Sequence, residues 1–144
     1  MKLTAYLLTL MAALAGCQAK KGALPASAQQ IADGEKVLAQ AIQQQLRDQI
    51  IIFHAQVVQV LRDDTKGSRH QRFIVKAETT GSTILIAHNI DLAPRLNGLK
   101  EGQKLVVSGE FEWNSKGGVV HWTHHDPKGQ RDGGWIYWRQ RIYQ

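Results

Sequence analysis

Apolar residues recur at helical spacing near the start of the chain, at Ile31, Leu38, Ile42 and Leu46. Ser27 and Gln30 have the spacing of a capping box, which marks the start of a helix. We therefore expect a helix over residues 28–48. Its apolar stripe is narrow, which indicates that it packs on another part of the domain.

From Ile50 onward the apolar period changes to about 2 residues, as in half-buried strands. The apolar residues of this first, long strand change parity at Val57 and Val58, which predicts a β-bulge there. The same alternation predicts further strands over residues 73–77, 83–88, 105–113, 119–124 and 135–143. Between the third and fourth strands, residues 89–98 predict a loop with one helical turn.

Five or six strands, of which the first is long and bent, predict a mainly β fold. A small OB-fold-like barrel with an N-terminal helix fits this order. A small sandwich or an SH3-like barrel would give a similar order of predicted strands and stays open as an alternative. The 144 residues suffice for one such domain, which we place at 27–144.

The first residues form a different kind of segment. Lys2 and the apolar run 3–15 are typical of a signal peptide, and the run is too short to span a bilayer comfortably. It ends in Leu14-Ala15-Gly16-Cys17, which resembles the lipobox of bacterial lipoproteins. That resemblance implies a signal peptide over residues 1–16 and acylation of Cys17. Residues 17–26 would then form a lipidated tether, and Gln18 after the cysteine implies outer-membrane sorting, with the domain facing the periplasm.

Charge and cysteine content limit the chemistry. Cys17 is the only cysteine, so its acylation would exclude cysteine catalysis, disulfides and thiolate-bound zinc. The formal net charge of +6 suits a membrane surface or an anionic ligand but does not decide between partners, and the aromatic residues of the last strand would also suit an oligosaccharide. A protein partner or nucleic acid would also be compatible with this charge.

The candidate chemistry is concentrated in one stretch, His121-Trp122-Thr123-His124-His125-Asp126-Pro127. It holds three of the six histidines, and all four tryptophans lie in the last quarter of the chain. This block, with Gly133-Gly134-Trp135-Ile136 after it, resembles DUF3465, a family of small exported bacterial proteins with an HWTH motif. The resemblance implies export and assigns no activity or site residues.

Regular strand geometry would place His121, Thr123 and His125 on one face and Trp122, His124 and Asp126 on the other. His124 and Asp126 could then converge on a divalent metal, with His125 or His88 completing the ligand set. Alternatively, the block is a structural corner. In that case Trp122 packs in the barrel, the histidines bond to backbone, and Thr123 and Asp126 fix the turn.

A third interpretation concerns the aromatic and basic residues that follow. In a strand over 135–143, Ile136, Trp138 and Ile142 would form core. The opposite face would be a binding surface with Trp135, Tyr137, Arg139, Arg141 and Tyr143.

The sequence therefore favours a binding module over an enzyme. Its ligand site would comprise the His121–Asp126 block together with Trp135, Tyr137, Arg139 and Arg141. The alternative function is a metal-assisted hydrolase, such as a nuclease, that uses the same histidines as base and ligands.

Overall fold

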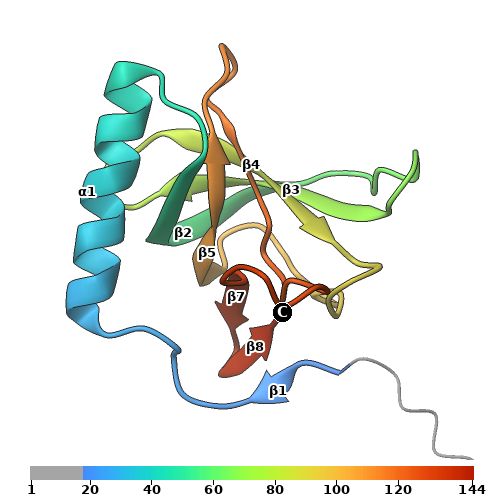
Figure 1. Ribbon diagram of the computed structural model, residues 1–144. Coiled ribbons are helices and arrows are strands. Elements are labelled where there is room, and N and C mark those ends of the chain that lie inside the picture. Colours follow the sequence, from blue (N-terminus) through green and yellow to red (C-terminus); the bar gives the residue numbers. More distant parts are fainter. Residues whose placement is uncertain (1–17) are drawn as a thin grey trace, which may run out of the picture.

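The computed structural model describes residues 18–144, which form one helix and eight strands (Figure 1). The elements are β1 (Lys20–Lys21), α1 (Ala28–Gln44), β2 (Gln49–Val60), β3 (His70–Ala77), β4 (Thr83–Asn89), β5 (Lys104–Glu112), β6 (Val119–His121), β7 (Trp135–Trp138) and β8 (Arg141–Tyr143). The predicted signal peptide and Cys17 lie outside the described residues. Within residues 18–144, no helix is both long and apolar enough to cross a membrane.

Five of the strands form a closed barrel. β2 pairs with β3 on one edge and with β5 on the other, and β3 pairs with β4. A parallel contact between β4 and β6 and an antiparallel contact between β6 and β5 close the circle. This mainly β, OB-fold-like barrel with one leading helix is the fold that the sequence predicted.

The first barrel strand has the predicted bulge. Its register against β3 shifts between Val57 and Gln59, where the apolar residues change parity. β2 can thereby curve, so that residues 49–56 pair with β5 and residues 55–60 pair with β3. Phe53, Phe73 and Phe111 point inward and are completely buried, so they form the centre of the barrel core.

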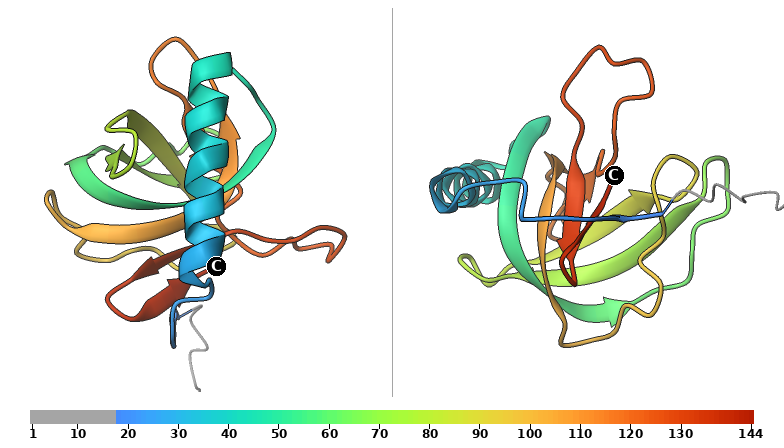
Figure 2. Two further views of the ribbon diagram at one scale, coloured as in Figure 1. Left: turned by 90° about the vertical axis from the view of Figure 1, so that its left-hand side faces the viewer. Right: turned by 90° about the horizontal axis from the view of Figure 1, so that it is seen from below.

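Helix α1 lies beside the first half of β2, as Figures 1 and 2 show from different sides. β3 pairs only from Ala55 onward, and the carboxylate of Glu35 accepts the backbone N–H of His54 at 3.1 Å at this free edge. Gly34 faces the backbone of Ile52 so closely that a Cβ would overlap it. The helix therefore covers the part of the β2 edge that β3 leaves unpaired.

The helix begins as predicted and ends earlier than predicted. The Ser27–Gln30 capping box is present, with both of its hydrogen bonds formed. The last helical residue is Gln44, because Gln45 adopts a left-handed conformation with φ of 57°.

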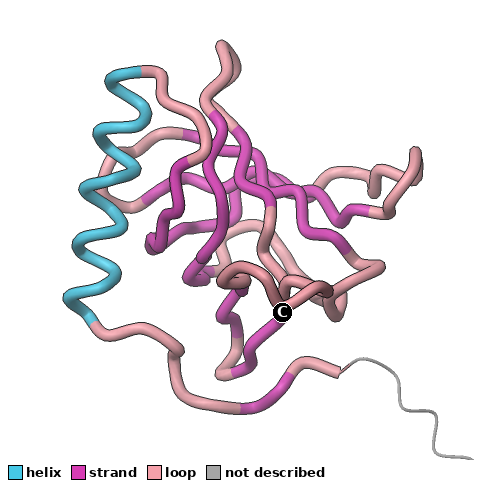
Figure 3. Tube along the Cα trace, viewed as in Figure 1, coloured by secondary structure: helices cyan, strands magenta, loops and turns pink. Residues whose placement is uncertain are grey.

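Two strand predictions were wrong. The strand expected over 119–124 stops at His121, because Trp122 has a positive φ of 60°. The single strand expected over 135–143 is instead the β7–β8 hairpin, which is visible as two short strands in Figure 3. It turns at Arg139 and Gln140, whose φ angles are also positive, at 50° and 57°.

Part of the expected tether is also folded. Lys20 and Lys21 form β1, which pairs with β8 at the edge of the sheet. The sheet continues from β8 through β7 to β5, so the start of the described chain is attached to the barrel rather than extended away from it.

Candidate functional site

The chain leaves the barrel wall directly after His121 and returns at Trp135. β6 pairs with β5 at Glu110–Glu112, and β7 pairs with the same edge of β5 at Val106–Ser108. Residues 122–134, here called the 122–134 loop, therefore connect β6 and β7, which lie end to end along β5. The loop projects from the barrel in both views of Figure 2.

The base of this loop is closed by backbone contacts that require glycine. The N–H of Gly134 donates to the carbonyl of His124 at 3.0 Å. A Cβ on Gly134 would overlap the carbonyl oxygens of Trp122 and Ser108. A Cβ on Gly109, on β5 opposite the base, would likewise overlap the carbonyl oxygen of His121. These glycines let three backbone segments approach one another.

Asp126 organises the tip of the loop. Its carboxylate accepts the backbone N–H groups of Lys128, Gln130 and Arg131 at 3.0, 2.8 and 3.0 Å. These donors, first of all Lys128, hold the pKa of Asp126 below its ordinary value. Asp126 is therefore a turn-forming residue, as the structural-corner alternative expected.

Thr123 attaches the loop to the barrel through a buried hydrogen bond. The buried Thr123 hydroxyl lies 2.7 Å from Nδ1 of His88 on β4, and Nε2 of His88 lies 2.9 Å from the carbonyl of Pro94. Because a carbonyl only accepts, Nε2 donates and Nδ1 accepts from Thr123. His124 is also buried, and its Nδ1 donates to the carbonyl of His125 at 2.6 Å.

The predicted metal ligands are not brought together. Both ring nitrogens of His88 are occupied inside the protein, and burial lowers its pKa to about 4. His124 bonds to backbone, His125 is exposed, and Asp126 serves the loop tip. The reason is that β6 ends at His121, so the regular alternation on which the metal prediction depended does not continue.

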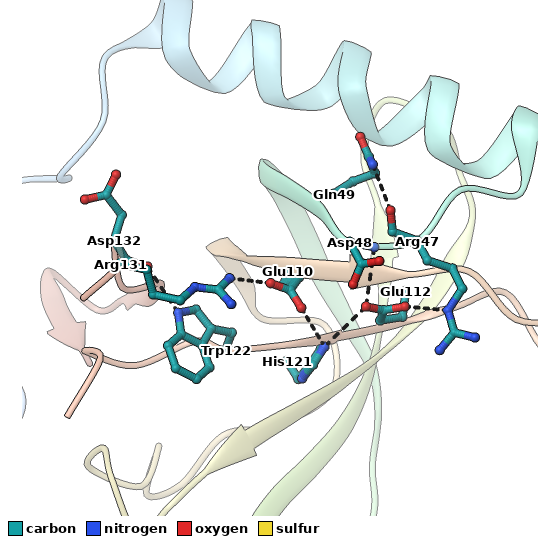
Figure 4. Close-up of polar contacts among 9 residues, drawn as sticks. All are labelled: Arg47, Asp48, Gln49, Glu110, Glu112, His121, Trp122, Arg131 and Asp132. Carbon is teal, nitrogen blue, oxygen red and sulfur yellow. Dashed lines mark hydrogen bonds and ion pairs between the residues drawn. The ribbon is translucent and has the colours of Figure 1, made fainter. Parts of the chain in front are cut away.

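His121 instead lies between two carboxylates on the outer wall of the barrel. Glu110 and Glu112 alternate with the buried Phe111 on β5, so both project outward. Nε2 of His121 lies 3.5 Å from Glu110 Oε1 and 3.9 Å from Glu112 Oε1 (Figure 4). This nitrogen has no hydrogen-bond partner and no solvent contact, although 43% of the side chain is exposed.

An arginine binds the far side of each carboxylate. Nε of Arg47, just after the helix, lies 2.7 Å from Glu112, and Arg131 of the 122–134 loop pairs with Glu110. The Arg47 guanidinium holds the pKa of Glu112 below its ordinary value. Figure 4 shows the resulting row, Arg131–Glu110–His121–Glu112–Arg47, which we call the charged row.

The charged row contains the one set of described residues with the geometry of a metal site. One ligand atom each from Glu110, Glu112 and His121 lies within 4.8 Å of the others. Tetrahedral zinc with bonds of about 2.0–2.1 Å separates its ligand atoms by about 3.4 Å, so a small contraction would suffice. The two arginines compete with a cation for the same carboxylates.

Beside the charged row lies a pocket of about 430 Å³ on the outer surface of β3, β4 and β6. Its lining combines basic, acidic and small apolar side chains: Arg47, Asp64, His70, Arg72, Ala87, Glu112, Val119 and His121. OB-fold barrels use this outer face, with its adjoining loops, to bind oligonucleotides and oligosaccharides.

Trp122 continues the site on the other side of His121. Arg131 covers one part of its indole at 4.4 Å, and the His124 ring lies 4.7 Å away. The indole N–H donates to the carbonyl of Asp132 at 3.1 Å. Trp122 stays partly exposed and lines two further pockets, of about 210 and 530 Å³. The loop thus holds an aromatic side chain beside the charged row.

The second predicted surface, on residues 135–143, is divided by the hairpin. Trp135 packs against Ile31 and Val106, and Tyr143 lies in the barrel core, so neither offers an aromatic face. Tyr137 and Arg139 line a separate pocket of about 320 Å³, and Arg141 is exposed. The expected parity holds in β7, where Ile136 and Trp138 lie in the core, and fails after the turn at Arg139 and Gln140, where Tyr143 instead of Ile142 lies in that core.

Several residues of this site were not predicted from the sequence: Arg47, Glu110, Glu112, His70 and Arg72. Glu110 and Glu112 did carry a signal, since they alternate with buried residues on the strand before His121. Arg47, His70 and Arg72 come from distant elements, and only closure of the barrel brings them to His121.

Comparison with known proteins agrees with the motif. Residues 22–144 match the model of a family described as "Protein of unknown function (DUF3465)". Comparisons with curated proteins and with solved structures found no match. The match extends over nearly the whole described chain and includes the barrel, the helix and the 122–134 loop. The chain therefore belongs to the DUF3465 family.

Proposed function

We propose that this protein is a ligand-binding module whose site is the pocket beside the charged row, and that its ligand is a hydroxyl-rich oligosaccharide. The observation that carries the proposal is the lining of that pocket, where hydrogen-bond donors and acceptors surround a small apolar floor. We further propose that the module is a lipoprotein of the cell envelope, anchored through Cys17 in the outer membrane and facing the periplasm.

The mixture of charges favours a saccharide. A hydroxyl group both donates and accepts hydrogen bonds. Arg47 and Arg72 supply donors, Asp64 and Glu112 supply acceptors, and Ala87 and Val119 give a flat apolar contact between them. Nucleic acid presents a row of phosphates, which the carboxylates of Asp64 and Glu112 would repel.

The length of the site favours a chain of sugars over a single one. Trp122 lies beyond His121, at the end of the charged row that carries Arg131 (Figure 4). Flat aromatic side chains bind the apolar faces of sugar rings, and this indole is held in place by Arg131 and the carbonyl of Asp132. One ring in the pocket and another at Trp122 would span the row.

The test is calorimetric titration of the mature protein with N-acetylglucosamine oligomers, with maltooligosaccharides and with a single-stranded oligonucleotide. We expect one saccharide class to bind and the oligonucleotide not to bind at physiological salt. Loss of the charged donor in Arg72→Ala should weaken binding about ten-fold or more. Lys66→Ala, in the exposed loop before β3, is the matched control and should bind normally. Equal affinity in both variants would place the ligand elsewhere.

A second candidate, a metal-assisted hydrolase, is favoured by one specific observation, the geometry of Glu110, Glu112 and His121. Three protein ligands and an open position facing a pocket are the arrangement of catalytic zinc sites, where the metal activates a water molecule. Arg47 and Arg131 could then stabilise negative charge that develops on a substrate.

Elemental analysis of the protein, purified without a histidine tag, separates the two candidates. The hydrolase requires near-stoichiometric metal that is lost in His121→Ala and kept in His125→Ala, whose imidazole is exposed on the loop. Absence of metal from the native protein, together with saccharide binding that survives a chelator, would leave the binding module alone.

A further inference from the structure

The described chain is attached to the barrel from its first residues. Lys20 and Lys21 pair with Ile142 and Arg141 of β8. The N–H of Gly22 donates to the carbonyl of Gln140 at 3.1 Å, and Nη1 of Arg141 donates to the carbonyl of Ala19 at 3.2 Å. In Figure 1 this strand runs along the lower side of the barrel. Backbone and side-chain bonds together fix the start of the domain there.

This attachment leaves no spacer after Cys17. Only Gln18 and Ala19 separate the cysteine from β1 in the sequence. Three residues of fully extended chain reach at most about 10 Å. An acyl group on Cys17 would therefore hold the β1–β8 edge of the barrel within about that distance of the bilayer surface.

The same edge carries a group of exposed cations: Lys20, Lys21, Arg139 and Arg141. None of them forms an ion pair with a carboxylate of residues 18–144. Lys21 and Arg141 are direct cross-strand partners, an arrangement in which like charges repel. An anionic surface against this edge would relieve the repulsion.

The hairpin turn exposes Arg139 in a backbone conformation that is unfavourable for a residue other than glycine. Arg139 and Gln140 both have positive φ, at 50° and 57°, where glycine or asparagine is usual in a two-residue turn. The Arg139 guanidinium lies 4.3 Å from the centre of the Trp138 ring. Strained positions of this kind are often functional.

A shallow pocket of about 250 Å³ opens beside the first described residue. Its lining includes Gln18 together with Arg95 and Arg141. Arg95 is half-buried and pairs with Asp63, whereas Arg141 has no acidic partner among the described residues. A phosphate group of a lipid headgroup suits two guanidinium groups of this kind.

We propose that the β1–β8 edge with its hairpin turn is the membrane-contacting face of the protein, and that it lies against the headgroups of an anionic phospholipid bilayer. Lys20, Lys21, Arg139 and Arg141 bind the headgroups, while the acyl groups on Cys17 hold the domain at the surface. Two such signals, a lipid and a basic patch, reinforce each other in membrane binding. The proposal depends on the anchor and is independent of which ligand the pocket beside the charged row binds.

The experiment uses the mature, lipid-anchored full chain, purified from membranes and reconstituted into vesicles. One set of vesicles contains phosphatidylcholine alone. The other contains about 30% phosphatidylglycerol, which gives the bilayer a strong negative surface potential. A water-soluble amine reagent labels lysines, and mass spectrometry reports the rate at each site. Lys116 is the internal control, because the β5–β6 turn that carries it projects from the opposite end of the barrel (Figure 1).

We expect Lys20 and Lys21 to be labelled several-fold more slowly in the anionic vesicles, with the difference removed by high salt. Lys116 should react equally in both. In Arg139→Ala/Arg141→Ala the protection should largely disappear, whereas Lys116→Ala/Lys128→Ala should keep it. Equal labelling of Lys20, Lys21 and Lys116 in both vesicle types would overturn the proposal. So would an intact mass without acyl groups on Cys17, because the anchor would then be absent.

Discussion

His88 is completely buried in the barrel wall, where it accepts from the Thr123 hydroxyl and donates to the carbonyl of Pro94. Both bonds fit the neutral imidazole, in which Nε2 carries the single proton and Nδ1 accepts from the hydroxyl. Burial accordingly lowers the pKa of His88 to about 4. At the scale of single residues, His88 is structural, whereas His121 and His70 belong to the candidate site.

The first prediction concerns the stability of the protein in acid. The pKa of His88 is about 4 in the folded protein, against an ordinary value of 6.5. Below pH 6.5 the unfolded chain binds a proton that the folded chain does not, so stability falls as the pH decreases toward 4. The loss reaches on the order of 3 kcal/mol by pH 4.

Urea denaturation at pH 7.5 and pH 4.5 measures this loss. In His88→Gln, which keeps a polar side chain without a titrating ring, the decrease in unfolding free energy between the two pH values should be clearly smaller. An equal decrease in both proteins would show that His88 does not titrate as its burial requires.

At the scale of elements, helix α1 illustrates how tertiary contact overrides local preference. Glycine at position 34 lowers helix propensity by about 1 kcal/mol relative to alanine. The structure explains its presence, because the helix backbone crosses Ile52 at a distance that excludes a Cβ. The residue that weakens the isolated helix is the one that allows it to dock.

Gly34→Ala should therefore destabilise the protein by about 1–2 kcal/mol, since the cost of overpacking against β2 exceeds the gain in helix propensity. Gln40→Ala, on the exposed side of the same helix, is the control and should be neutral or slightly stabilising. Thermal unfolding of both variants measures the effect. A more stable Gly34→Ala would contradict the close contact between α1 and β2.

The conformation of the 122–134 loop likewise depends on one residue, Asp126. Asp126→Ala removes the acceptor of three backbone N–H groups, so the tip should open more often. We expect tryptic cleavage after Lys128 and Arg131 to become several-fold faster. Asp126→Asn keeps one acceptor oxygen and should give an intermediate rate. Unchanged cleavage in Asp126→Ala would mean that other contacts hold the loop.

The elements differ in how far the sequence could predict them. The capping box at Ser27, the parity change at Val57 and the alternation around Phe111 are local signals, and the helix, the bulge and the barrel strands followed from them. The 122–134 loop after His121 has no such local signal in the sequence. It depends on Trp122 adopting a positive φ and on glycines that allow backbone segments to meet.

The site was predicted in part for the same reason. His121 and Trp122 were expected in the ligand site, and the structure places them in and beside the charged row. The two carboxylates next to His121 come from β5, and the arginines that pair with these carboxylates come from the segment after α1 and from the loop. The turn at Arg139 and Gln140 divided the second expected surface, since two non-glycine residues with positive φ are not anticipated from propensity.

At the scale of the whole molecule, the net charge of +6 is unevenly arranged. On the outer wall around His121, arginines alternate with carboxylates, which suits a ligand with both donors and acceptors. At the β1–β8 edge the cations have no acidic partners among residues 18–144, which suits an anionic surface. Two faces of one barrel thus have different electrostatic character.

The central claim is that the ligand site lies on the outer wall beside His121. Its most direct test is chemical-shift mapping of the ¹⁵N-labelled mature protein during titration with the saccharide that binds most tightly. The account predicts the largest shifts at residues 70–72, 87, 119–122 and 131, with little change in β7 and β8. Shifts confined to β7 and β8, or spread evenly over the barrel, would contradict it.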